Sequence, residues 1–273
     1  MQILHGMCEF KERYASFMQH FCDKGYIVVC HDQRGHGDSI KESADLGYFY
    51  DDSAKGIVED GAQITTYLKE QYPNLPIILF GHSMGSMVAR CYLREHDNLV
   101  DKVVVCGSPS KNPAAGVAVG MAKGIGLFRG MHHRSKLLCY LSTGKGQKKF
   151  PGEAKGAWLS QNRENIEAFH ANPKGRFVFT CNGFVNLFKL MKYTYKKKGY
   201  LVQAPTLPIH FISGSDDPVL VSDLKWFQSI EFLRGVGYEN VTGKLYKGLR
   251  HEVFHDVGRE EVLADLLAFM DGE

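Results

Sequence analysis

The chain has 273 residues, of which 44% are hydrophobic and 23% are charged, a composition typical of a globular protein with one large core. The formal net charge of +3 is too small to predict a nucleic-acid partner, and the densest basic run, at 196–198, is typical of a solvated face. No stretch reaches the roughly 18 uninterrupted apolar residues that predict a membrane-spanning helix.

The seven cysteines are odd in number, irregularly spaced and never arranged as CxxC, so they give no support to a zinc site. Most lie inside apolar runs such as "IVVCHD" and "VVVCGS". This placement favours buried free thiols in a reducing compartment. Because no signal peptide is present either, we expect a cytoplasmic protein.

Short apolar runs alternate with helical patterns through the first hundred residues. Helical faces recur over 14–21, 57–68 and 84–91, and apolar β-rich runs lie at 25–32, 75–81 and 101–108. Near-continuous apolar runs are typical of strands that are buried on both faces of a parallel sheet. The repetition therefore predicts an α/β fold with a doubly wound, mostly parallel sheet.

The alternation stops after residue 109 and resumes near residue 206. The second part has expected strands at 208–213 and 241–248 and expected helices at 222–234 and 259–271. Between 110 and 205 there are helical and irregular pieces without a clear buried strand. We therefore predict a core of residues 1–109 and 206–273, with residues 110–205 inserted as a mainly helical cap over the carboxyl edge of the sheet.

The predicted cap contains an apolar stretch at 116–131 with Gly116, Gly120 and Gly124 at four-residue spacing. Such spacing lets a helix pack closely on a neighbour. A lid that contacts lipid surfaces is the alternative interpretation. Four phenylalanines further along fit either an acyl pocket or core packing: Phe177, Phe179, Phe184 and Phe188.

The stretch "FGHSMGSM", residues 80–87, places Ser83 between two glycines at the end of an apolar run. The Gly-x-Ser-x-Gly pattern is weak alone, but here it follows a predicted parallel strand and opens a predicted helix, the setting of a nucleophile elbow. Gly81 and Gly85 remove side chains that would collide where strand and helix cross. We therefore predict that Ser83 is an activated nucleophile.

A serine nucleophile needs a basic histidine, and that histidine needs an orienting acid. In folds with this elbow the acid comes next along the chain, on a loop after a later strand. The strand at 208–213 ends in "SGSDDPV". Asp217 is favoured as the acid because Pro218 fixes the turn immediately after it, whereas Asp216 fits the role of a turn residue.

The candidates for the base lie after the last predicted strand, in "YKGLRHEVFHD". His251 follows the loop directly, so its imidazole can reach the active edge of the sheet. His255 lies four residues later and is expected to pack or to hydrogen-bond locally. The predicted catalytic residues are thus Ser83, Asp217 and His251.

An acyl-transfer site also needs donors for the oxyanion. The backbone N–H of Met84, at the start of the predicted helix, is one candidate. The second is the N–H of Met7 in "ILHGMCE", where Gly6 lets the backbone approach the substrate closely.

With these residues in place, the chain resembles the α/β-hydrolase superfamily, and more narrowly its lysophospholipase and monoacylglycerol lipase-like, or serine aminopeptidase-like, branch. The resemblance is carried by "LHGMCEFKERY", "VVCHDQRGHGDS", "ILFGHSMGSMVAR", "ISGSDDPV" and "GLRHEVFHD". The stretch "WLSQNRENIEAFHANPKGRFVFTCNGFVNLF" is similar to the cap of bacterial members. The resemblance implies the same triad and the same two oxyanion donors, and a structural role for "DQRGHGDS".

The resemblance further implies a serine esterase or lipase that forms an acyl-enzyme, acts on monoacyl lipid or other small esters and needs no metal or organic cofactor. An aminopeptidase-like amidase and an acyltransferase with the same triad stay open, because the fold does not separate them. A catalytically silent binding module is the alternative outside the enzymes. The expected partners are the ester substrate and, through the cap, a transient contact with a membrane surface, with no nucleic acid.

Family members usually have a longer segment before the His-Gly pair, whereas here four residues precede it. Either the given start is truncated or the protein lacks the first edge strands of the sheet. Without those strands, the strand at 25–31 would expose an unpaired apolar edge, which a partner or strand pairing usually covers. We therefore expect the first edge strands to be absent and leave the oligomeric state open.

Overall fold

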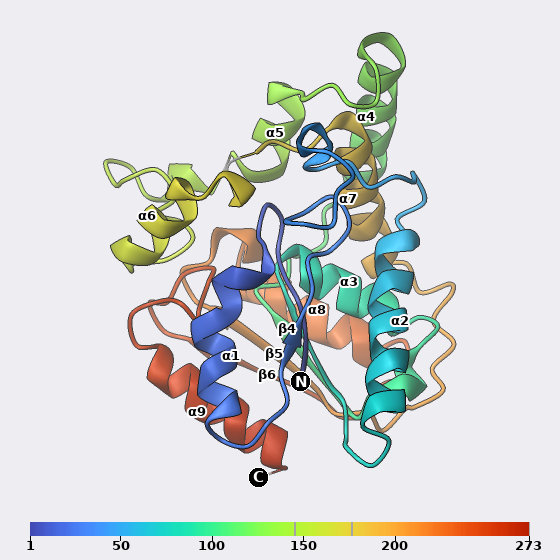
Figure 1. Cartoon of the computed structure of the whole chain (residues 1–273), viewed down its shortest axis with the longest axis vertical. Coiled ribbons are helices and arrows are strands. Elements are labelled where there is room, and N and C mark those ends of the chain that lie inside the picture. The colour runs from blue at the N-terminus through green and yellow to red at the C-terminus, as the bar shows by residue number, and fades with distance from the viewer. Residues whose placement is uncertain (145, 176, 273) are drawn as a thin grey trace.

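The computed structural model describes residues 1–144, 146–175 and 177–272. Its centre is a six-stranded parallel sheet with the order β2-β1-β3-β4-β5-β6 (Figure 1). The strands are β1 (Gln2–Leu4), β2 (Val29–Cys30), β3 (Ile78–His82), β4 (Lys102–Cys106), β5 (Ile209–Gly214) and β6 (Val241–Tyr246). The predicted parallel α/β sheet is confirmed.

Helices cover both faces of this sheet (Figure 1). α1 (Ala15–Cys22) and α9 (Arg259–Asp271) lie on one face, and α2 (Gly56–Gln71), α3 (Met84–Tyr92) and α8 (Asp223–Arg234) lie on the other. Successive strand side chains point to opposite faces. Phe80 and Val104 accordingly belong to the core under α1 and α9, whereas Leu79 and Val103 belong to the core under α2, α3 and α8.

The apolar run at 25–32 differs from the expectation. It forms only the two-residue strand β2, whose residues are half-buried, and Ile27 just before it is 39% exposed. β2 pairs with β1 and lies at the edge of the sheet, with no further strand beyond it in the described part of the chain. The prediction of a buried strand was wrong here, because an apolar run does not reveal how many neighbours a strand has.

The chain between β4 and β5 is helical, with no strand among its described residues. Its helices are α4 (Ala115–Arg129), α5 (Lys136–Thr143), α6 (Arg163–Ala171) and α7 (Cys181–Thr194). They form a layer at one end of the molecule (Figure 1). We call residues 110–205 the cap segment, and its division from the core as a separate unit stays a prediction.

Short 3-10 helices complete the described elements. They cover Lys11–Tyr14, Ser43–Asp45, Asp97–Leu99, Gln147–Lys149, Pro173–Gly175 and Pro218–Leu220. None of the helices within the described ranges is both long enough and apolar enough to cross a membrane.

α4 packs on α7, and of its glycines Gly126 lies against Cys181 of α7, whereas the three glycines at four-residue spacing do not lie at this contact. A side chain added at Gly116, Gly120 or Gly124 would meet nothing within 4 Å, so the expectation that these glycines allow close packing was wrong. They lie with apolar side chains on an open face of the helix. Leu127 and Phe128, at its end, are 80% and 85% exposed.

Charge is divided unevenly between the cap segment and the rest of the chain. The cap segment has seventeen of the 33 Lys and Arg residues but three of the 30 Asp and Glu residues. The rest therefore has sixteen basic and twenty-seven acidic side chains. Because the cap helices lie at one end of the longest axis (Figure 1), this end of the molecule is rich in basic side chains, some of which pair with Asp38 and Asp52 of the core.

Candidate active site

Ser83 lies on the turn between β3 and α3, one residue before the helix. Its backbone has φ 52° and ψ −115°, a strained conformation that non-glycine residues rarely adopt and that recurs at functional turns. A side chain at Gly81 would collide with the backbone of Gly85, and one at Gly85 would collide with the backbone of Leu4. The two glycines thus permit the sharp turn that presents the serine.

His251 and Asp217 form a buried pair on the loops after β6 and β5. Nδ1 of the imidazole lies 2.8 Å from Asp217 Oδ2. Because a carboxylate accepts, Nδ1 carries the proton of the neutral ring and Nε2 is the basic nitrogen. The carboxylate also accepts hydrogen bonds from Ser213 Oγ and Val219 N, both at 3.0 Å. Burial lowers the pKa of His251, but the Asp217 carboxylate outweighs burial and raises it above the ordinary value.

Ser83 and His251 line the same cavity, which has a volume of about 440 Å³. No hydrogen bond joins Ser83 Oγ to His251 Nε2 in the described part of the chain. Catalytic hydrogen bonds are often long in the absence of substrate and tighten when it binds. The arrangement therefore remains compatible with proton transfer from the serine to the imidazole.

Asp216 and His255, the less favoured candidates for the acid and the base, are not among the residues that line this cavity. Asp216 is exposed, and its carboxylate accepts a local hydrogen bond from Ser215 Oγ at 3.3 Å. His255 is buried with its ring centroid 6.1 Å from that of Tyr14. Burial lowers the pKa of His255 to about 4.

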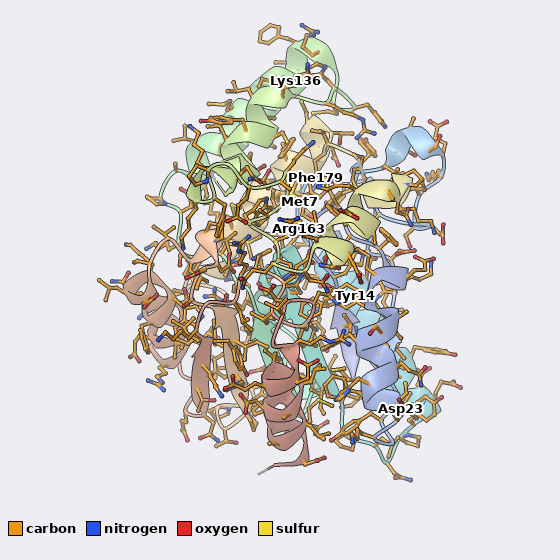
Figure 2. All side chains as sticks on the ribbon, turned by 90° about the vertical axis from the view of Figure 1, so that its left-hand side faces the viewer. Met7, Tyr14, Asp23, Lys136, Arg163 and Phe179 are labelled. Carbon is orange, nitrogen blue, oxygen red and sulfur yellow. The ribbon has the colours of Figure 1, made fainter. Side chains whose placement is uncertain are left out.

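The two predicted oxyanion donors belong to residues that line the cavity. Met84 is the first residue of α3, so its N–H has no partner within the helix. Met7 follows β1 and lies between the core and the cap segment (Figure 2). A side chain at Gly6 would come within 3.2 Å of Ser83 Cβ, so glycine permits the close approach of this loop to the serine.

The side-chain carboxylate of Glu9 holds the loop after β1 in place. Its Oε2 accepts hydrogen bonds from Gly6 N at 2.5 Å and Tyr14 OH at 2.7 Å, and lies 3.2 Å from His82 Nδ1. Burial raises the pKa of Glu9, but its interactions with His82, Arg13 and Tyr14 outweigh burial and hold the pKa well below the ordinary value. The loop is therefore fixed by an ionised, fully bonded carboxylate.

Arg13 connects Glu9 to the loop of the candidate base and to the cap segment. It donates to Glu9 Oε1 at 2.8 Å and to both carboxylate oxygens of Glu252 at 3.0 and 2.8 Å. It also donates to Asn165 Oδ1 at 3.1 Å, and its guanidinium carbon lies 4.5 Å from the ring centroid of Phe169. Both of these residues belong to α6. A buried ion cluster thus joins three separate segments around the cavity.

Sequence reasoning assigned no role to Glu9, Arg13 or Glu252. The four-residue spacing of Glu9 and Arg13 was a usable signal, because side chains at this spacing pair on a helical turn. The pairing of Arg13 with Glu252, 239 residues further along the chain, depends on the fold and has no local signal.

Apolar side chains from the core and the cap segment line much of the cavity. They include Met84, Met87, Leu187, Met191 and Val219. Of the four phenylalanines considered for an acyl pocket, Phe177 lines the cavity. The other three belong to the cap segment too, but their side chains are buried in the hydrophobic interior and do not line the cavity.

A parallel sheet with a strained serine turn and an Asp–His pair beyond its carboxyl edge is the arrangement of an α/β hydrolase. The sequence model of the family described as serine aminopeptidase, S33, matches residues 1–258. The chain therefore belongs to this family.

Two curated relatives match nearly the full length of the chain. A monoacylglycerol lipase of Mycolicibacterium smegmatis is 26% identical over 268 residues, which cover 98% of this chain and 86% of the relative. Phospholipase YtpA of Bacillus subtilis is 24% identical over 274 residues, which cover 98% and 93% respectively. The structure of a carboxyl esterase from Bacillus coagulans matches with a TM-score of 0.87 and 26% identity, covering 99% of this chain and 88% of that one. The chain is thus an esterase/lipase-like α/β hydrolase.

Proposed function

We propose that the protein hydrolyses carboxylic esters through an acyl-enzyme formed on Ser83. The observation that carries this proposal is the shared cavity, which is lined both by a serine on a strained turn and by the histidine of the buried Asp217–His251 pair. Three similar proteins bear the names of a lipase, a phospholipase and an esterase, which favours esters as substrates.

In the proposed reaction, His251 Nε2 takes the proton of Ser83 while Oγ attacks the ester carbonyl. Asp217 holds the imidazole in the required tautomer and stabilises its charged form. The N–H groups of Met7 and Met84 stabilise the oxyanion, an effect of about 3 to 4 kcal/mol for one donor in a comparable site. His251 then protonates the leaving alcohol, and water activated by the same histidine releases the acid. The scheme uses no metal or organic cofactor.

A monoacyl lipid, such as a lysophospholipid or a monoacylglycerol, is the proposed substrate class. The apolar lining contributed by α3 and α7 supports it, because such a surface favours an acyl chain over water. The names of the lipase and phospholipase relatives agree with this substrate class.

Hydrolysis of p-nitrophenyl esters from acetate to palmitate tests the proposal, with Ser83→Ala as the control. We expect activity that peaks at a long chain and is lost in the variant, together with labelling of Ser83 by a fluorophosphonate. Labelling without ester hydrolysis would favour an amidase, and acyl transfer to an added alcohol in place of hydrolysis would favour an acyltransferase. Folded protein that is not labelled would be a silent binding module.

We further infer a cytoplasmic protein that contacts membrane surfaces transiently through the cap segment. All seven cysteines are free thiols, which supports a reducing compartment. The open apolar face of α4, together with the basic excess of the cap segment, is suited to an anionic lipid surface. Lys136, at the far end of the cap segment in Figure 2, belongs to this basic excess.

Co-sedimentation with vesicles tests the surface contact. We expect binding to vesicles that contain phosphatidylglycerol to exceed binding to phosphatidylcholine alone, and to weaken in Phe128→Ser. Phe227→Ser, on α8 of the core, is the matched control, because Phe227 is also exposed. Equal loss in both variants would contradict a contact through the cap.

A further inference from the structure

The position of His251 indicates which part of the cavity holds the leaving alcohol of an ester. The imidazole that takes the proton of Ser83 must return it to the leaving alcohol, so the leaving group of an ester lies beside His251. The acyl chain extends from the same carbonyl toward the apolar lining, which includes Met84 and Met87 of α3. The residues packed around His251 therefore border the space for the alcohol.

Trp158 of the cap segment lies next to the candidate base. Its ring centroid is 5.1 Å from that of His251, the two planes are inclined by 36°, and both residues line the cavity with Ser83. Gly146 packs closely against the indole. A side chain added at Gly146 would lie 3.0 Å from Trp158 Cδ2. The indole is therefore held between the imidazole and a second part of the cap segment.

Backbone groups on both sides of the tryptophan are bonded to residues on both sides of His251. Arg250 Nη1 donates to Ala157 O at 2.7 Å, and Glu252 N donates to Leu159 O at 2.7 Å. The position of the tryptophan is thus tied directly to the loop that carries the imidazole.

Asp256 binds the two residues that follow Leu159 through hydrogen bonds. Its Oδ1 accepts from Ser160 Oγ at 2.9 Å and from Gln161 N at 2.6 Å, while Oδ2 accepts from Arg250 N at 2.8 Å. Gln161 Nε2 also donates to Gly248 O at 2.9 Å. Residues 157–161 and 248–256 therefore form one hydrogen-bonded unit, which we call the histidine clasp. Because Trp158 belongs to this unit, the side of the cavity that it forms is held in position and is able to select ligands by size.

We propose that Trp158 is a specificity-determining residue that limits the size of the leaving alcohol. The inference rests on the proposed ester hydrolysis. The indole closes the alcohol side of the cavity beside His251, so that esters of small alcohols, such as methanol or glycerol, and of one-ring phenols, such as p-nitrophenol, fit, whereas esters of two-ring aromatic alcohols such as 2-naphthol do not. Trp158 is assigned no role in selecting the acyl chain.

Three esters with one acyl group test this assignment: methyl, 1-glyceryl and 2-naphthyl decanoate. We expect kcat/KM for the naphthyl ester relative to the methyl ester to rise about tenfold or more in Trp158→Ala, and by less in Trp158→Phe. The preference among acyl chain lengths should stay as in the wild type. Met87→Ala is the matched control, for which we expect the reverse: a changed chain-length preference and an unchanged ratio between leaving groups.

The outcomes separate this inference from the function on which it rests. A ratio that stays constant, or an equal loss for all three esters, would show that Trp158 acts through the fold alone and would overturn the inference. Fluorophosphonate labelling of Ser83 in each variant shows whether the site is assembled, and Trp158→Phe replaces Trp158→Ala if the latter does not fold. Wild-type protein that reacts with neither ester nor fluorophosphonate would refute the proposed function and this inference with it.

Discussion

His251 must be neutral to accept a proton from Ser83, so activity requires a pH above the pKa of the imidazole. Because Asp217 raises this pKa above its ordinary value of about 6.5, we expect the acid limb of kcat/KM to have its midpoint above that pH. Asp217→Asn removes the charge and leaves burial, which lowers the pKa. The limb should then move to lower pH while kcat falls by about 10⁴.

Rate profiles of the wild type, Asp217→Asn and Asp216→Asn check this assignment. Among the described residues, no hydrogen bond or ion pair joins the exposed Asp216 to the imidazole, so its variant should keep the wild-type limb. A shift in Asp216→Asn without one in Asp217→Asn would reverse the roles of the two carboxylates.

Glu9 is a second residue whose negative charge should affect stability and activity, because it is buried and paired with Arg13. Glu9→Gln leaves Arg13 with one anion fewer in a buried site, so we expect a loss of about 3 kcal/mol in the free energy of unfolding. We also expect a lower kcat, because the carboxylate fixes the loop that carries the N–H of Met7. Urea denaturation and ester hydrolysis measure the two effects.

Glu12→Gln is the matched control for this substitution. Glu12 is half exposed and forms surface ion pairs with Lys11 and Lys174, which contribute less than about 1 kcal/mol each. If both variants lose equally little stability and activity, the assignment of Glu9 as a positioning residue is wrong.

At the level of elements, local patterns predicted much of the fold. The helices expected at 222–234 and 259–271 are α8 and α9 almost to the residue, because the residues that bound them are local: Ser222 caps the start of α8, and Gly258 and Gly272 flank α9. The turn at Ser83 was predictable for the same reason, since the two flanking glycines lie within four residues of each other. The burial of 25–32 was not, because it depends on neighbouring strands.

The contacts of the cap segment were beyond sequence reasoning. Residues 157–161 form no regular helix or strand, and their place is set by hydrogen bonds to residues about ninety positions further along the chain. The stretch is similar in sequence to the cap of bacterial members, but nothing within it indicates that it contacts the loop of the candidate base. Irregular segments carry no periodicity from which a partner can be inferred.

The histidine clasp should depend on Asp256. In Asp256→Asn an amide N–H₂ replaces one carboxylate oxygen, so at least one buried donor among Ser160 Oγ, Gln161 N and Arg250 N loses its acceptor. We expect a loss of about 1 to 3 kcal/mol in the free energy of unfolding, measured by urea denaturation. The exposed Glu260→Gln serves as the control, and equal stabilities of the two variants would show that the clasp contributes nothing.

The stability of the whole molecule should fall on mild acidification. Burial lowers the pKa of His36 to about 3 and those of His31 and His255 to about 4, so all three stay neutral in the folded protein between pH 5 and 6.5. In the unfolded chain, with ordinary pKa values near 6.5, they bind protons in this range. Because the unfolded state then binds more protons, stability decreases as pH falls, by about 1.4 kcal/mol per pH unit for each fully protonated histidine.

Urea denaturation at pH 5.0, 5.75 and 6.5 measures this slope. We expect it to be smaller by nearly one proton in His255→Gln, a variant that removes one of the three groups. His20→Gln is the control, since His20 of α1 is half-buried, unlike the buried His255. A slope that is the same in all three proteins would show that the buried His255 does not govern the acid response.

The uneven division of charge described for the cap segment makes the cap end of the molecule basic, while the rest of the chain carries an excess of acidic side chains. An anionic surface attracts the basic end and repels the acidic remainder of the chain, so its field turns an approaching molecule before any contact is made. The turning force acts over about one Debye length, roughly 8 Å at physiological ionic strength, and is lost in concentrated salt. Productive encounters with such a surface should therefore slow as salt is added, even where the cap residues that make the contact are unchanged.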